Sequence, residues 1–250
     1  MARRATLIKR LRDTYADLLV LDSGNALVGK PTTLGNQTQG KLIIAAMNMI
    51  GYDAMVLGER ELSLGPTILR QRMQEAQFPI LSANVVISAT GELFTAPYVI
   101  RQMGGHTVAI VGLTEPLSPI RAAGEREALL ARDPIQFGVP YVQEAAQKAD
   151  IVIVLSHMGI ALDEQLAAAV PAIDLIVGGR DRVLRHPTRY GESGPLITQV
   201  SIEGQIIGVA DLKIDPSGKV VRFSGRLEAL GEEVPDDPEM RALLDSYAKQ

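Results

Sequence analysis

The sequence has 250 residues, of which 46% are hydrophobic and 22% are charged, and these values suit one large globular domain with a sizeable core. Its formal net charge of −4 argues against a nucleic-acid-binding surface, and the lack of cysteine excludes disulfides, thiolate nucleophiles and cysteine metal ligands. The sequence contains no apolar run near the roughly 18 residues of a membrane-spanning helix, so we predict no transmembrane segment.

Helix-like and strand-like patterns alternate through the first two thirds of the chain. Leu7, Ile8 and Leu11 lie on one helical face, which predicts an amphipathic helix over residues 3–15. The apolar run at residues 17–21 is typical of a strand covered on both faces. Further helices are predicted over 39–50, 65–77, 141–148 and 162–170, further strands over 54–57, 80–82, 98–102, 108–113, 151–155 and 173–177, and loops over 29–37 and 117–133.

The last third of the chain changes character. It predicts antiparallel strands over 196–200, 205–214 and 219–230, joined at Glu203-Gly204 and at residues 215–218, and then a closing helix over 236–247. Because βα units come first and an antiparallel meander comes later, we predict an α/β (α+β) fold. It would consist of two mixed β-sheets packed face to face and flanked by helices, in a single domain over residues 1–250.

Polar, glycine-bearing loops follow four of the predicted strands. They are Asp22-Ser23-Gly24-Asn25, Gly58-Glu59-Arg60-Glu61, Ser156-His157-Met158-Gly159 and residues 178–182. Since functional loops of α/β sheets follow the carboxyl ends of the strands, we expect these four loops to meet at one site. Thr114-Glu115-Pro116 follows another strand end, and it either lines the same cleft or is a plain loop, with the loop role favoured.

Short motifs spread along the whole chain carry a resemblance to a known family. In chain order they include 2–6 (Ala-Arg-Arg-Ala-Thr), 22–25 (Asp-Ser-Gly-Asn), 51–54 (Gly-Tyr-Asp-Ala), 58–61 (Gly-Glu-Arg-Glu), 78–84 (Phe-Pro-Ile-Leu-Ser-Ala-Asn), 155–159 (Leu-Ser-His-Met-Gly) and 173–182 (Ile-Asp-Leu-Ile-Val-Gly-Gly-Arg-Asp-Arg). The pattern resembles the N-terminal domain of the 5′-nucleotidase family of calcineurin-like phosphoesterases. The resemblance implies a four-layer metallophosphoesterase sandwich and a phosphoric monoester hydrolase that uses two divalent metal ions.

The chain departs from the family pattern at the positions that the family uses for its metals. The resemblance places Asn25 where the family has a bridging carboxylate and Glu59 where it has an asparagine ligand. The two histidines of the family's Gly-Gly-His-x-His motif correspond to Arg180 and Arg182, and His157 alone matches a family ligand. We also expect the family's first strand, which ends in an Asp-x-His ligand pair, and its C-terminal nucleotidase domain to be absent from this chain.

The catalytic positions implied by the resemblance are changed as well. Arg60 stands where the family has a transition-state-stabilising histidine, and Ser63 stands where it has the assisting aspartate. Two-metal hydrolysis needs two cations held about 3.5–4 Å apart, and a guanidinium has no acceptor atom with which to bind a cation. We therefore predict that no cofactor is needed. As an alternative, His157 and Glu59 would hold a divalent metal (Mn, Zn or Mg) at low occupancy.

Three interpretations of these loops stay open. In the first, which is favoured, Asp22, Glu59, Glu61 and Asp181 neutralise the nearby arginines in a structural network. In the second, Arg60, Arg180 and Arg182 join His157 in a pocket for a phosphate-like anion or a nucleotide. In the third, residual metal binding persists.

The functional prediction follows from these interpretations. We expect a pseudoenzyme-like phosphoesterase domain with a scaffold or ligand-binding role, and the alternative is an active nucleotide hydrolase that uses a divalent metal. Members of the family are commonly exported, but the sequence shows no signal-peptide pattern, so its localisation stays open, as do its protein partners.

Overall fold

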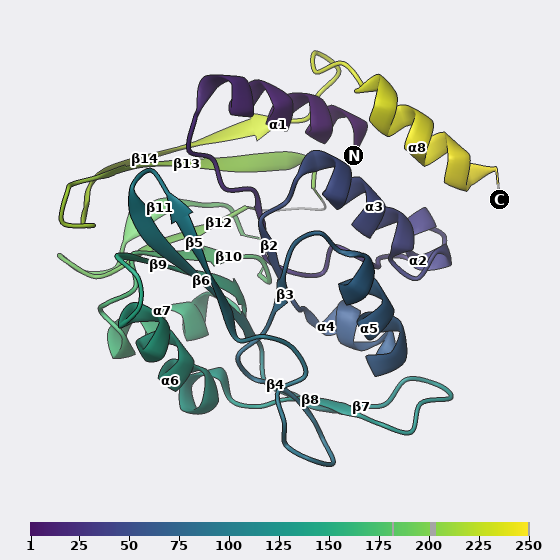
Figure 1. The fold of residues 1–250 in the computed structure, drawn as a ribbon, viewed down its shortest axis with the longest axis horizontal. Helices are drawn as coiled ribbons and strands as arrows, with labels where there is room; N and C mark the ends of the chain where they lie inside the picture. The colour runs from purple at the N-terminus through teal and green to yellow at the C-terminus, as the bar shows by residue number, and fades with distance from the viewer. Residues whose placement is uncertain (182, 201–203, 250) are drawn as a thin grey trace.

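The computed structural model describes residues 1–181, 183–200 and 204–249, which form a mixed α/β fold that runs from α1 (Ala2–Thr14) to α8 (Pro238–Ala248) (Figure 1). The other helices are α2 (Leu34–Gln37), α3 (Lys41–Ile50), α4 (Glu59–Leu62), α5 (Gly65–Glu75), α6 (Pro134–Ala146) and α7 (Ile160–Ala169). The first strands are β1 (Leu21–Asp22), β2 (Ala54–Val56), β3 (Ile80–Leu81), β4 (Val85–Ile87), β5 (Tyr98–Met103), β6 (His106–Thr114), β7 (Leu117–Ile120) and β8 (Leu129–Ala131). They are followed by β9 (Ile151–His157), β10 (Leu175–Gly178), β11 (Arg185–Arg189), β12 (Leu196–Gln199), β13 (Ile206–Ile214) and β14 (Val220–Ala229).

The largest sheet has six strands in the order β11-β12-β10-β9-β6-β5. Its four central strands are parallel, and the two edge strands are antiparallel to their neighbours. Every residue of β9 is buried, which explains why its sequence is a continuous apolar run and not an alternating pattern. The edge strand β5 forms a hairpin with β6, because Met103 pairs with His106 across the Gly104-Gly105 turn.

A smaller parallel sheet, in the order β1-β2-β3, packs against one face of the six-stranded sheet. Ala54, Val56 and Leu81 of the smaller sheet share one buried cluster with Ile110 and Leu155 of the larger one. The two sheets therefore bury a common apolar layer, and the carboxyl ends of β2 and β9 approach each other.

Helices cover the outer faces of these two sheets (Figure 1). Val142 of α6 and Leu166 of α7 pack on the six-stranded sheet. Met47 of α3 and Leu69 of α5 share a cluster with Met55 of β2, and α1 and α8 join the same cluster. Within the described residues, no helix is long and apolar enough to cross a membrane.

Some elements differ from the sequence-based predictions. The first strand is short, Leu21–Asp22, and the segment 117–133 contains β7 and β8, which pair with each other and with β4 instead of forming a loop. The strand predicted over 196–200 as antiparallel is β12, which pairs in parallel with β10 and antiparallel only with β11. A short apolar run does not indicate which strand it pairs with when that partner lies far along the chain, so these pairings could not be predicted from the sequence. The predicted join at Glu203 lies outside the described residues.

A buried amide fixes the strand ends that carry the site. The Asn84 Nδ2 donates to the carbonyl oxygens of Thr114 and Arg132, each at 2.7 Å, and the Thr114 N–H donates to Asn84 Oδ1 at 2.9 Å. The Thr114 hydroxyl donates to the Leu57 carbonyl at 2.8 Å. These bonds connect the ends of β2 and β6 with the segment after β8, so the loops beyond them have a fixed relative position.

Candidate functional site

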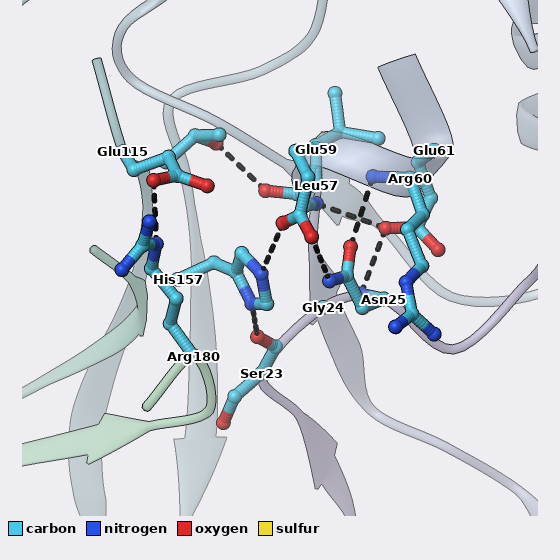
Figure 2. A network of polar contacts seen from close by, with 12 residues as sticks. Ser23, Gly24, Asn25, Leu57, Glu59, Arg60, Glu61, Glu115, His157 and Arg180 are labelled. Carbon is cyan, nitrogen blue, oxygen red and sulfur yellow. Dashed lines mark hydrogen bonds and ion pairs between the residues drawn. The ribbon is translucent and has the colours of Figure 1, made fainter. Parts of the chain in front are cut away.

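Loops that follow β1, β2 and β9 converge as the sequence predicts (Figure 2). His157 comes from the end of β9, Glu59 from the first turn of α4 and Asn25 from the loop after β1. The loop after β10 brings Arg180 to the same place through its contact with Glu115. The carboxyl edges of both sheets thus meet at one polar cluster.

His157 is the centre of this cluster, and its side chain is only 1% exposed. Its Nδ1 lies 2.6 Å from the Ser23 carbonyl oxygen, so Nδ1 carries a proton, and its Nε2 lies 2.8 Å from Glu59 Oε2. The hydrogen bond from His157 lowers the pKa of Glu59 to about 2. Burial alone would lower the pKa of His157, but the hydrogen bond to Glu59 raises it above the ordinary value. The pair is therefore an imidazolium and a carboxylate.

Asn25 holds the other oxygen of Glu59. Its Nδ2 donates to Glu59 Oε1 at 2.8 Å, and its Oδ1 accepts from the backbone N–H of Arg60 at 3.0 Å. Asn25 has a φ of 60°, in the left-handed region that asparagine tolerates better than most residues. Both polar atoms of the amide are thus used within the loop network, and the Asn25 side chain orients Glu59.

Glycine at position 24 allows the loop to approach His157. Gly24 has a φ of 89°, and a Cβ placed there would lie 2.9 Å from His157 Nδ1, closer than real Cβ atoms come to other atoms. Any side chain at this position would be strained and would displace the imidazole. The short loop after β1 can therefore present the Ser23 carbonyl directly to the ring.

Glu61 is fully buried and clamps two of the loops from beneath. Its carboxylate accepts the backbone N–H groups of Asn25 at 2.8 Å, Gly58 at 2.9 Å and Leu27 at 2.9 Å. Burial raises the pKa of Glu61 to about 7, although the three N–H donors favour its ionised form. Glu61 was predicted to neutralise an arginine, but its observed contacts are to backbone amides.

Glu115 and Arg180 form the opposite wall of the cluster. Arg180 Nε lies 2.5 Å from Glu115 Oε2, and Arg180 Nη1 lies 3.3 Å from Asp181 Oδ1. The Glu115 backbone N–H donates to the His157 carbonyl at 2.9 Å, which holds the two residues on neighbouring strand ends. Burial raises the pKa of Glu115, and the charge of Arg180 opposes that shift. The side chain of Glu115 is 10% exposed and that of Arg180 is 42% exposed.

These contacts create a group that suits one cation. Ligand atoms of Glu59, Glu115 and His157 all lie within 4.8 Å of one another. Imidazole nitrogens and carboxylate oxygens are both ligand types that zinc and similar ions bind. Glu59 and His157 were predicted from the sequence as candidate ligands, whereas a plain loop role was favoured for Glu115. Its only sequence signal was its position directly after a buried strand.

The remaining predicted site residues lie less centrally or outside the described residues. The Arg60 backbone binds Asn25, but its guanidinium points away from His157 (Figure 2). The Ser63 hydroxyl donates to the Arg60 carbonyl at 2.6 Å at the end of α4, away from the cluster. Arg182 lies outside the residues that the structure describes.

A second buried polar group lies behind His157. The Ser156 hydroxyl donates to Asp163 Oδ1, while Asp163 Oδ2 and the side-chain amide of Gln199 are buried without a hydrogen-bond partner among the described residues. Burial raises the pKa of Asp163 to about 6 from its ordinary value of 3.8. The folded state therefore holds the Asp163 proton in a pH range where the unfolded chain has released it.

This shift gives a pH prediction for Asp163→Asn. Wild-type stability should fall as pH rises from about 4 to about 6, because the unfolded state then binds fewer protons than the folded state. Two pKa units correspond to about 3 kcal/mol at most, and we expect about 1–3 kcal/mol. The variant should lose this pH dependence. The unfolding free energy of Asp163→Asn, relative to that of wild type, should therefore rise between pH 4 and pH 8. Glu192→Gln, at an exposed position whose charge is not among those that shift the pKa of Asp163, is the control and should keep the wild-type slope. Parallel curves for wild type and Asp163→Asn would contradict the prediction.

Comparisons with known proteins agree with this architecture. No protein-family model matches the chain. It is 29% identical to the trifunctional nucleotide phosphoesterase YfkN of Bacillus subtilis, over all of this chain and 20% of that protein. It is 28% identical to the snake venom 5′-nucleotidase of Naja atra, over all of this chain and 51% of that protein. The crystal structure of a 5′-nucleotidase precursor from Thermus thermophilus matches with a TM-score of 0.87 and 28% identity, over 99% of this chain and 52% of that chain.

The fold and the meeting strand ends define a calcineurin-like phosphoesterase domain. Within that class the chain is similar along its whole length to the N-terminal domain of the 5′-nucleotidase family, as the sequence motifs predict. The chain spans a fifth of the first of these relatives and about half of the second.

Proposed function

We propose that this chain is a four-layer phosphoesterase domain whose site holds one divalent metal ion and does not carry out two-metal phosphoester hydrolysis. The observation that carries the proposal is the group of Glu59, Glu115 and His157, whose ligand atoms lie within 4.8 Å of one another. A metal bound there would supply Lewis-acid polarisation of a phosphoryl or carboxylate oxygen. The proposed metal ion builds on the alternative predicted from the sequence, a divalent metal held weakly by His157 and Glu59. That no cofactor is needed stays a prediction.

The hydrogen bonds around His157 support its role as a ligand. A metal-binding histidine usually donates its second N–H to a carbonyl or carboxylate, and His157 Nδ1 donates to the Ser23 carbonyl in this way. Its Nε2 then faces Glu59, with a proton that a cation would replace. The Asn25 amide keeps one Glu59 oxygen in place, so two of the three ligands are already oriented.

A second metal ion does not fit the described residues at this site. Asn25 offers a neutral amide where a bridging carboxylate is needed, and both of its polar atoms are hydrogen-bonded within the loops. Arg180 brings a permanent positive charge to the opposite wall. One cation can be compensated by the two carboxylates, whereas two divalent cations would leave a large excess of positive charge.

The same site offers a place for a phosphate-like anion or the phosphate of a nucleotide. A cavity of about 300 Å³ adjoins the cluster, and its lining includes Pro116, Met158, Leu162 and the half-exposed Arg180. A guanidinium binds phosphate oxygens in a bidentate manner, and apolar side chains can contact the rest of a small ligand. The relatives named as nucleotide phosphoesterase and 5′-nucleotidase suggest the nucleotide.

Metal titration and a turnover assay test this function. We expect calorimetry with Zn²⁺ or Mn²⁺ to give one equivalent per chain for wild type and none for His157→Ala. No phosphomonoester turnover that depends on His157 is expected with any of these metals. The alternative function, a working nucleotide hydrolase, predicts two equivalents and turnover of a nucleoside monophosphate that His157→Ala abolishes.

For the anion, a rise in Tm with added nucleotide would indicate binding to the folded state.

A further inference from the structure

Arg180 occupies a carboxylate that the single-metal site requires. Its Nε lies 2.5 Å from Glu115 Oε2, on the side chain that completes the group with Glu59 and His157. A short ion pair of this kind engages one of the two Glu115 oxygens and puts a permanent positive charge beside the group. A cation that binds all three ligands must therefore compete with the guanidinium for the Glu115 carboxylate.

The surroundings of Arg180 allow it to leave, whereas Glu115 is fixed. Glu115 is tied to the neighbouring strand end by its backbone bond to the His157 carbonyl, and its side chain is largely buried. Arg180 is 42% exposed, and its Nη1 already lies 3.3 Å from Asp181 Oδ1. Asp181 itself is held in place, since its Oδ2 accepts the N–H of Ile160 at the start of α7 at 2.6 Å. The guanidinium thus has a second acidic partner outside the metal-binding group.

We propose that Arg180 is a built-in competitor for Glu115, which weakens divalent-metal binding at the site and so sets its affinity. The inference rests on the proposed single-metal function and adds the residue that determines how tightly the metal is held. In the resting protein Arg180 takes the place of a cation beside Glu115. A bound metal ion would displace Arg180 from Glu115 toward Asp181 or solvent.

Removal of the guanidinium should therefore tighten metal binding. Changes beside a metal ligand typically alter affinity by about 10–100-fold, and we expect Arg180→Gln to lower the Kd for Co²⁺ or Zn²⁺ by that factor. Arg185→Gln is the matched control, because Arg185 pairs with Glu164 at 2.9 Å and its loss removes the same charge from a pair away from Glu115. Calorimetry of the full chain gives the Kd, and the visible spectrum of bound Co²⁺ reports on the ligand set.

A double-mutant cycle separates competition for Glu115 from general charge repulsion. In the Glu115→Gln background, Arg180→Gln should raise metal affinity only slightly, because the carboxylate that the substitution would free is missing. The inference is overturned if Arg180→Gln binds Co²⁺ no tighter than Arg185→Gln, or if its gain is the same in both backgrounds. If the correctly folded wild type and Arg180→Gln both bind no metal, the proposed function itself fails. If wild type binds one ion and Arg180→Gln is unchanged, only the role of Arg180 is wrong.

Discussion

Replacing Glu61 with alanine should destabilise the protein by about 3–5 kcal/mol, because three backbone N–H groups, those of Asn25, Leu27 and Gly58, would lose their acceptor inside the protein. Each unsatisfied buried donor costs about 1–3 kcal/mol, and part of the cost would be recovered by rearrangement or by water entry. For a domain of this size the change corresponds to a fall in Tm of roughly 6–20 °C.

Thermal unfolding followed by circular dichroism measures this loss, at pH 8, where Glu61 is ionised. Hydrogen exchange adds a local measurement, because the amides of Asn25, Leu27 and Gly58 should lose protection in the variant. Glu144→Ala is a surface control: Glu144 contacts only Lys148 and the Tyr98 hydroxyl among its described side-chain partners, at an exposed i,i+4 position, and its loss should lower Tm far less than Glu61→Ala does. An unfolding free energy for Glu61→Ala within about 1 kcal/mol of the wild-type value would show that the three hydrogen bonds of Glu61 are not needed for stability.

Asn84→Ala should cost a comparable amount, about 3–5 kcal/mol, at the junction of the two sheets. The Asn84 amide donates to the carbonyls of Thr114 and Arg132 and accepts from the Thr114 N–H, and all three partners would be left without this bond. Asn84 is fully buried, so water can replace these bonds only by entering the core. Chemical denaturation of wild type and variant measures the difference in unfolding free energy.

Asn48→Ala provides a matched control for Asn84→Ala. The Asn48 side chain also makes two bonds to backbone, with the Glu75 carbonyl and the Gln77 N–H, each at 2.8 Å, but it does so at a partly exposed helix end. Water can replace those bonds, so the expected cost is about 1 kcal/mol. Equal losses in the two variants would contradict the view that burial at the sheet junction makes Asn84 important.

The mixed α/β class followed from the sequence because its signals were local and strong, but the prediction of two mixed sheets was wrong: the described strands form four sheets, and β1-β2-β3 is parallel throughout. Continuous apolar runs such as 151–155 predicted strands covered on both faces, and the order of motifs from residue 2 onward indicated the family. The convergence of the loops that carry Asn25, Glu59 and His157 also followed, since carboxyl ends of parallel strands share an edge. Short strands such as β7 and β8 were missed, because only their partners far along the chain make them strands.

The contacts inside the site could not be predicted from residue types alone. The acids and arginines of these loops were expected to neutralise one another, but Glu59 pairs with His157 and Glu61 binds backbone amides. Arg180 does pair with acids, and one of them is Glu115, which was set aside as a loop residue. Which acid meets which base depends on loop conformations, such as the left-handed Asn25, that spacing does not encode.

Electron paramagnetic resonance of the Mn²⁺-loaded protein tests the central claim most directly, because it distinguishes an isolated ion from a coupled pair. The account predicts the hyperfine spectrum of isolated Mn²⁺ that saturates at one ion per chain and disappears in His157→Ala. An exchange-coupled spectrum that grows in at two ions per chain would contradict it, since the residues described around His157 would then hold the dinuclear centre that their charges argue against.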